Sequence, residues 1–184
     1  RMHYNPWRRN TREDFQAAVQ SLHERIPALS DQQILVEFQK LASMLGDGHS
    51  RVSISSQQID VPVLPIAMYL FTDGLFIIDA DAQHRDLVGS RVVSIGGVPT
   101  DEVFIRLRDV VSWDNLMGVD WLGPRFLRAT SVLENLGLTD DPGRVEMTVV
   151  DRSGSQRDVA LEPAPLEMSR RLIPSRLEDA PGPP

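Results

Sequence analysis

The stretch Leu87–Val103, LVGSRVVSIGGVPTDEV, changes its pattern in the middle, and this change decides the fold. RVVSI is a short apolar run with β-branched residues, which predicts a strand. Gly96-Gly97 then predicts a tight turn, because glycine readily adopts the backbone angles that turns require. Thr100 is expected to cap a helix that begins directly afterwards. A strand, a turn and a helix therefore follow one another within a few residues.

Further strand and helix patterns lie on both sides of this stretch. Before it, IAMYLF and LFIIDA flank Thr72-Asp73-Gly74, and Asp-Gly is typical of a hairpin. After it, Leu116–Leu136 predicts a helical region that Pro124 should break or kink. Two last strands are expected over 144–150 and 156–161. Strands and helices do not alternate regularly, which predicts an α+β fold with about five strands and two helices in this part.

The first part of the chain predicts a helical hairpin. TRED at Thr11 and SDQQ at Ser30 are capping-box patterns, and Pro27 and Gly46 are expected to end the two helices. Each helix carries one apolar face that needs a partner. These faces are formed by Phe15, Val19, Leu22 and Ile26 and by Ile34, Phe38, Leu41 and Leu45.

The segment that follows, LGDGHSRV at Leu45–Val52, predicts an Asp-Gly turn that presents His49 before a short strand over 51–55. Taken alone, His49 is most simply a turn residue whose imidazole is tied to Asp47 or to a carbonyl. The other histidines, His3, His23 and His84, give no pair at the spacing of a zinc-binding helix.

Composition excludes several classes of site. The sequence has no cysteine, so it offers neither disulfides nor a thiolate zinc site. It also lacks a phosphate-binding glycine loop and a G-x-S-x-G nucleophile elbow. We therefore expect no metal and no cofactor. Of 19 Lys and Arg residues only Lys40 is lysine, so a catalytic lysine would have to be Lys40 or come from outside this chain.

Charge and hydropathy address the partners. The formal net charge of −7 argues against a nucleic-acid surface, which would need a basic patch. No apolar run is long enough to span a membrane, and no signal peptide is recognised. Because the sequence starts at Arg1 and ends in LEDAPGPP, we expect it to be a piece of a longer protein.

The order of the pieces resembles a known family. The motifs are LASMLGDGHSRV, then LPI, DGLFIIDA, LVGSRVVSIGGVPTDEV, DNL and VLENLG. Together they resemble the N-terminal half of the tail-specific, or C-terminal-processing, serine peptidases, closest to the branch related to the tricorn core protease. The pattern L-x-G-x-x-V-x-x-I-x-G-x-P is similar to the PDZ-like element of that family. The resemblance covers roughly residues 11–163.

The resemblance implies a division of the chain. Residues 1–60 would form the helical hairpin and a short strand, 61–163 a PDZ-like domain, and 164–184 a proline-rich linker to an absent catalytic domain. Because the nucleophilic serine of the family lies in that absent domain, the chain alone would be inactive and would handle substrate. Its partners would be a peptide or protein substrate and the C-terminal catalytic domain. The family also implies a secreted or periplasmic location.

The resemblance further assigns a role to one histidine. In the tricorn-like branch a histidine at the place of His49 is the general base, completed here by a serine outside this chain. That branch has a serine before the histidine, where this sequence has Gly48. In the other branch the serine pairs with a lysine, and both lie in the absent domain. The choice between His49 and such a lysine stays open.

Two alternatives also remain. The chain could belong to a relative on the same scaffold that binds small apolar ligands without proteolysis, or it could be a free-standing PDZ-like module that binds peptides. VLPIAMYL, where a PDZ carboxylate-binding loop would lie, lacks the glycines of such a loop.

Overall fold

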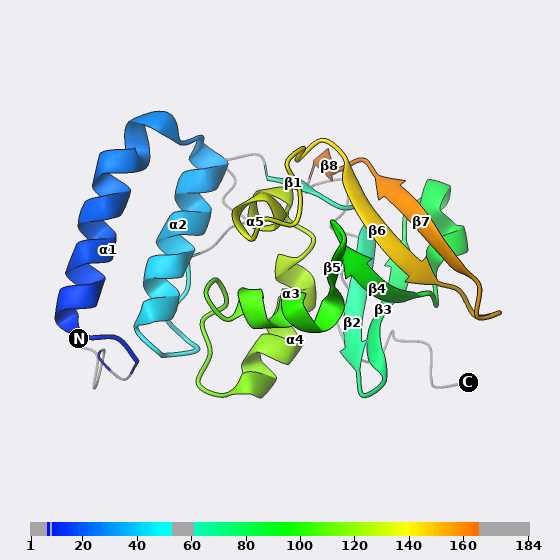
Figure 1. Ribbon diagram of the computed structural model, residues 1–184, viewed down its shortest axis with the longest axis horizontal. Helices are drawn as coiled ribbons and strands as arrows, with labels where there is room; N and C mark the ends of the chain where they lie inside the picture. The colour runs from blue at the N-terminus through cyan, green and yellow to red at the C-terminus, as the bar shows by residue number, and fades with distance from the viewer. Residues whose placement is uncertain (1–6, 8, 53–60, 166–184) are drawn as a thin grey trace.

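A helical hairpin stands beside a mixed α/β part in the computed structural model, which describes residues 7, 9–52 and 61–165. Helices α1 (Arg12–Arg25) and α2 (Asp31–Met44) lie side by side at one end of the molecule, and the sheet occupies the other end (Figure 1). The fold is therefore the predicted one, with N-terminal helices followed by an antiparallel sheet consistent with a PDZ-like domain.

Both predicted capping boxes are present. Thr11 Oγ1 accepts from the Asp14 N–H at 3.1 Å, and the Asp14 carboxylate accepts from the Thr11 N–H at 3.0 Å. Ser30 and Gln33 exchange the same two bonds at the start of α2. These bonds satisfy N–H groups that have no partner within the helix. The short 3₁₀ helix η1 (Ile26–Ala28) joins the two helices.

The sheet is antiparallel and has the strand order β2-β3-β4-β6-β7, with β5 paired to β4. The predicted hairpin is confirmed in β2–β3 around Thr72-Asp73, and the two last predicted strands, β6 and β7, form a second hairpin around 151–155. A separate two-stranded sheet pairs β1 with β8. The strands are β1 (Pro62–Val63), β2 (Ile66–Phe71), β3 (Gly74–Ala80), β4 (Arg91–Ile95), β5 (Val98–Pro99), β6 (Val145–Val150), β7 (Gln156–Leu161) and β8 (Ala164–Pro165).

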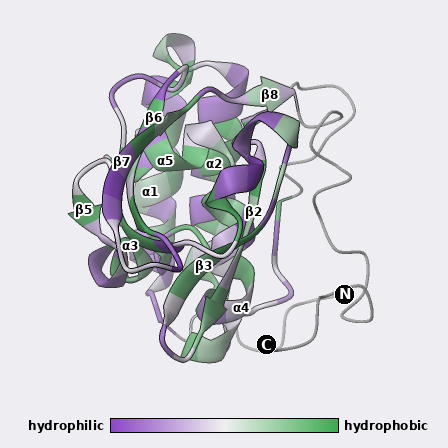
Figure 2. Ribbon diagram, turned by 90° about the vertical axis from the view of Figure 1, so that its right-hand side faces the viewer, coloured by the Kyte–Doolittle hydropathy of each residue, from purple (hydrophilic) through white to green (hydrophobic). Residues whose placement is uncertain are grey.

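The core lies between this sheet and the helices α3 (Thr100–Leu107), α4 (Leu116–Phe126) and α5 (Thr130–Asn135). Figure 2 shows the curved sheet with its strands coloured partly as apolar, and with the helices behind it. The 3₁₀ helix η2 (Ala82–Leu87) packs on β3. Apolar burial of this kind is the main favourable term in folding. On the sheet side, the core includes Val145, Met147 and Val149, which alternate with less buried residues and share one face of β6.

Gly96-Gly97 forms the turn that the sequence predicted, with φ of 56° and 74°. The Gly96 N–H donates to the Glu146 carbonyl at 2.8 Å, and a Cβ added at Gly96 would lie 1.7 Å from the Leu138 carbonyl oxygen. Glycine is therefore required at Gly96 both by its backbone angles and by this close approach.

Two local expectations were wrong, and a third was right. Thr100 does not cap α3 but is its first residue, because its hydroxyl donates to the Val92 carbonyl at 2.9 Å instead. The predicted break in 116–136 is present, since the region forms two helices and α4 ends two residues after Pro124. Arg51 and Val52 are not in a strand, and 53–60 lie outside the described residues.

The expected linker, 164–184, is described only at its start. Its first two residues form β8, and the others lie outside the described part of the chain. Within the described ranges, no helix combines the length and the apolar character needed to cross a membrane.

Candidate functional site

The turn that follows α2 is organised by Asp47. Its Oδ1 accepts from the His49 N–H at 3.1 Å, and its Oδ2 accepts from the Ser50 hydroxyl at 2.8 Å. The Ser50 N–H also donates to the Asp47 carbonyl at 3.1 Å. Aspartate favours turns because its side chain can bond to backbone two residues ahead. The turn thus fixes the backbone of His49 and leaves its side chain 88% exposed.

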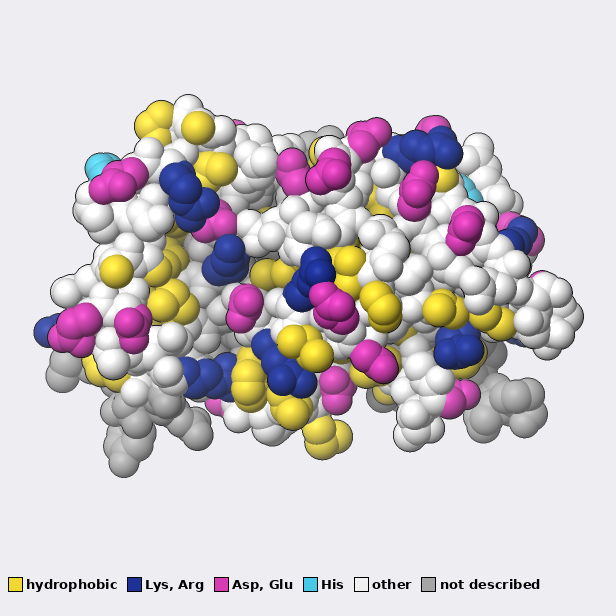
Figure 3. Space-filling model, viewed as in Figure 1, with side chains coloured by type: hydrophobic (Ala, Val, Ile, Leu, Met, Phe, Trp, Pro, Cys, Tyr) yellow, Lys and Arg dark blue, Asp and Glu magenta, His cyan; other side chains and the backbone are white. Residues whose placement is uncertain are grey.

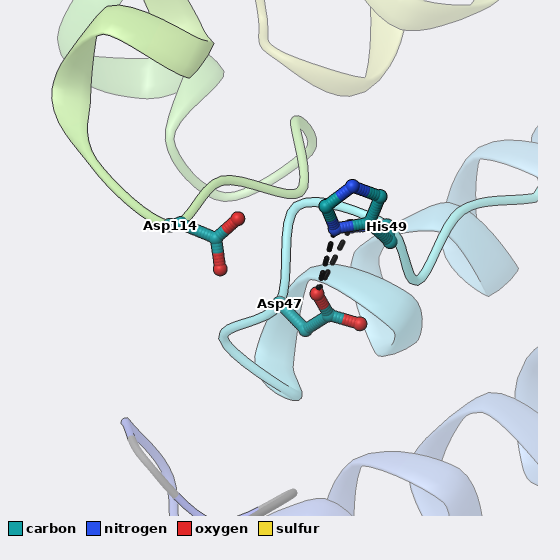
Figure 4. A group of neighbouring side chains, drawn as sticks. All are labelled: Asp47, His49 and Asp114. Carbon is teal, nitrogen blue, oxygen red and sulfur yellow. Dashed lines mark hydrogen bonds and ion pairs between the residues drawn. The ribbon is translucent and has the colours of Figure 1, made fainter.

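The imidazole of His49 also contacts the same carboxylate. Its Nδ1 lies 3.4 Å from Asp47 Oδ1, as the dashed line in Figure 4 marks. A carboxylate beside Nδ1 favours the tautomer that carries its proton there, and Nε2 then has the lone pair that accepts a proton. The tie between His49 and Asp47 that turn chemistry predicted is therefore present.

A second carboxylate reaches this pair from far along the chain. Asp114 lies in the loop between α3 and α4, and one ligand atom from each of Asp47, His49 and Asp114 lies within 4.8 Å of the others. Figure 4 shows Asp114 facing the His49–Asp47 pair from a separate segment. Among the described residues, these three side chains form a group of His and acidic residues whose donor atoms are close enough together to hold a metal ion.

Gly48 lets Asp114 come this close. A Cβ built on Gly48 would lie 2.8 Å from Asp114 Oδ2, closer than real Cβ contacts allow. The backbone of Gly48 does not have a positive φ, so the need for a small residue is purely one of space. At this position the protein therefore has a glycine that leaves room for a carboxylate.

Gln39 joins the two loops that carry these residues. It is fully buried, and its Nε2 donates to the Val110 carbonyl at 2.8 Å and to Ser112 Oγ at 3.1 Å. Its Oε1 accepts from the Val52 N–H at 2.8 Å. One amide on α2 thus links the end of the His49 turn to the loop that leads to Asp114. Sequence reasoning missed this residue, which the pattern of α2 places among polar surface positions.

Glu37 fixes α2 between its neighbouring helices. Its carboxylate accepts from Arg25 of α1 at 2.6 Å and from Asn135 of α5 at 2.8 Å, and Lys40 lies 3.2 Å away. Burial alone raises the pKa of Glu37, but the hydrogen bonds from Arg25 and Asn135 and the charge of Lys40 outweigh it and hold that pKa below its usual value. Lys40, the single lysine, is thus engaged in an ion pair.

The remaining histidines lie elsewhere. His84 is in η2, where its Nδ1 is 2.6 Å from Asp81 Oδ1. His23 is exposed on α1, and His3 is outside the described residues. In the described part of the chain, neither His84 nor His23 belongs to a group with two carboxylates as His49 does.

Comparison with known proteins yields structural matches alone. Neither a protein-family model nor a curated protein matches the sequence significantly. Two solved structures of mature CPAF, one of them complexed with lactacystin, match with TM-scores of 0.52 and 0.54 at 14% and 18% identity. Each match covers 89% of this chain and 32% or 33% of the CPAF chain.

A third solved structure, a CPAF mutant, matches with a TM-score of 0.52 at 18% identity, over 82% of this chain and 28% of its own. The chain therefore spans about a third of the length of the proteins it resembles. At such identity the matches establish the fold and no more. The described chain therefore shares the fold of about a third of the CPAF chain.

Proposed function

We propose that this chain is the N-terminal, substrate-handling part of a tail-specific-protease-like serine peptidase of the branch related to the tricorn core protease. His49 is its general base, and the serine nucleophile comes from a catalytic domain outside this chain. One observation carries the proposal: an exposed imidazole, oriented by Asp47, stands on a turn within a fold shared with a third of mature CPAF.

The chemistry follows from the arrangement of the turn. With its proton on Nδ1 toward Asp47, the ring accepts the proton of an attacking serine at Nε2, and the carboxylate then stabilises the imidazolium. The neighbouring Ser50 is not placed as the nucleophile, because its hydroxyl donates to Asp47 Oδ2. A serine that approaches from outside the chain would find the exposed side of the ring.

A peptide-handling role is supported by the outer surface of β2 and α4. In the described sheet β2 lies at one end of the strand order and pairs with β3. α4 packs beside β2. Hydrophobic side chains gather in the region of α4 in Figure 3. The exposed apolar side chains on these two elements are Tyr69, Phe71, Leu116, Met117 and Trp121.

These exposed side chains fit a peptide or protein substrate better than a small apolar ligand, because small ligands bind in concave pockets that enclose them. Monomeric proteins rarely leave several large apolar side chains exposed together without a partner. The same proposal includes a secreted or periplasmic location, which the resemblance to the tail-specific serine peptidases implies.

The test is made in the full-length parent protein. His49→Ala should reduce the rate of peptide hydrolysis by at least about 100-fold, the contribution typical of a positioned general base. His84→Ala is the matched control, since it also removes a histidine paired through Nδ1 with an aspartate, and it should leave the rate unchanged. Full activity of the His49→Ala protein would refute the assignment.

The 184-residue chain alone should hydrolyse no peptide. Genuine turnover by this chain, abolished by a substitution within it, would show that the nucleophile is internal. Tight binding of C-terminal peptides by a chain whose parent has no peptidase activity would instead support the free-standing module.

A further inference from the structure

We propose that Asp47, His49 and Asp114 form a binding site for a divalent transition-metal ion, for which Zn²⁺ is the probe. The three residues come from two loops that are 65 positions apart in the sequence, as the numbers 49 and 114 show. A local motif could not have identified this site. The evidence is the spacing of the donors, the space at Gly48 and the chemistry of the donor set.

The spacing of the first two donors already matches a zinc site. Zinc bonds of about 2.0–2.1 Å to nitrogen and oxygen in a tetrahedron place neighbouring donors about 3.3–3.4 Å apart. His49 Nδ1 and Asp47 Oδ1 are 3.4 Å apart. Asp114 offers a carboxylate oxygen within 4.8 Å of a ligand atom of each of the other two residues, which exceeds that spacing by at most about 1.4 Å. Asp114 is exposed at the surface of the loop that carries it.

The space for the third donor exists because residue 48 is glycine. A Cβ there would lie 2.8 Å from Asp114 Oδ2, so the carboxylate would have to leave its present position. Gly48 therefore leaves space for the Asp114 carboxylate, whereas the backbone of the turn does not itself require glycine. This makes Gly48 a test of the site that removes no donor.

The donor set favours a transition metal over a harder cation. One imidazole nitrogen with two carboxylate oxygens suits zinc and its neighbours, whereas Ca²⁺ takes 6–8 oxygens and Mg²⁺ retains much of its water. Asp47 is also held by the Ser50 hydroxyl and the His49 N–H, and such outer bonds orient ligands in metal sites. Water would complete the coordination on the exposed side.

Occupancy of the site has a consequence that rests on the proposed function. A neutral imidazole bound to metal through Nδ1 carries its proton on Nε2. Nε2 is the atom that would have to accept the serine proton, so the metal-bound ring no longer acts as a base. Asp47 and a metal ion thus favour opposite tautomers of His49, and the metal acts as an inhibitor.

Binding is tested on the untagged 184-residue chain by calorimetric titration with Zn²⁺ alone. We expect one ion per chain. Loss of an outer-shell partner typically lowers metal affinity by about 10–100-fold. His49→Ala and Asp114→Asn remove a ligand itself, so they should lower the Zn²⁺ affinity by at least that much. Gly48→Ala should weaken binding by about tenfold, within the same range. His84→Ala should bind as the unmodified chain does, and circular dichroism confirms that each variant is folded.

Three results would overturn the site: no Zn²⁺ binding by the unmodified chain, unchanged affinity in Asp114→Asn, or Ca²⁺ binding more tightly than Zn²⁺. Nitrogen-15 spectra of the histidine rings supply a second readout, since Zn²⁺ should move the His49 proton from Nδ1 to Nε2 and leave His84 unaffected.

The metal site and the catalytic role fail separately. If Zn²⁺ binds as expected but His49→Ala leaves the parent fully active, the site stands and the proposed base is wrong. If His49→Ala abolishes activity but the chain binds no Zn²⁺, the base stands and the metal site is wrong.

Discussion

Replacing Gln39 by leucine should destabilise the protein and loosen the candidate site together. Leucine has a similar size but no polar atoms, so three groups lose a partner: the Val110 carbonyl, the Ser112 hydroxyl and the Val52 N–H. Val110 and Ser112 are buried, so water cannot easily replace the lost bonds there.

Each buried polar group left without a partner costs about 1–3 kcal/mol. Val52 is only half-buried and can reach water, and the leucine side chain recovers some apolar burial. We therefore expect Gln39→Leu to lower the free energy of unfolding by about 2–4 kcal/mol. Urea titration followed by circular dichroism measures this change.

The same substitution should raise amide hydrogen exchange in both loops, 45–52 and 108–114, because Gln39 links them. Gln20→Leu on the exposed face of α1 is the control, since its amide bonds only to Glu24 one turn away, and it should change stability by less than about 0.5 kcal/mol. A Gln39→Leu protein as stable as this control, with unchanged exchange in the two loops, would show that Gln39 does not organise the site.

Two further substitutions test the packing around the site. Glu37→Gln should lower stability at neutral pH by about 1 kcal/mol, because Arg25 and Lys40 are partly exposed and lose only screened interactions. The pKa of Glu37 in the folded protein lies below its usual value of 4.5. The loss of stability caused by Glu37→Gln should therefore be complete above pH 4.5 and should vanish as the pH falls through the folded pKa. Urea titrations that show a constant loss, or a loss that grows at low pH, would contradict this origin. Gly96→Ala should lower the free energy of unfolding by more than about 2 kcal/mol, because its Cβ would clash with the Leu138 carbonyl. Gly97→Ala has nothing within 4 Å of its added Cβ and should lose only the backbone penalty of about 1 kcal/mol. Equal thermal unfolding of the two variants would refute the clash with Leu138.

Much of the architecture could be predicted because local chemistry decides it. The capping boxes at Thr11 and Ser30 fix where the two first helices begin, and Asp73-Gly74 and Gly96-Gly97 specify two tight turns. Period-two alternation identified the buried face of β6. In each case the deciding interactions lie within a few residues, so the sequence contains them directly.

The errors arose where a distant partner overrides a local preference. Thr100 is a good capping residue, but its hydroxyl finds the Val92 carbonyl of the neighbouring strand. Gln39 and Asp114 looked like ordinary polar positions, although the fold buries the first and brings the second beside His49. Only the tertiary packing of α2 against the loop before α4 creates these contacts.

The pairing of β1 with β8 also bears on how this architecture can change during evolution. Pro62 lies opposite Pro165 and Val63 opposite Ala164, so the two ends of the segment 64–163 lie side by side. Paired strands are only about 4.8 Å apart. A gene rearrangement could therefore remove or exchange that whole segment as a cassette, and a very short peptide would rejoin the cut ends. Shuffling of such units between proteins is easiest where the two ends already touch.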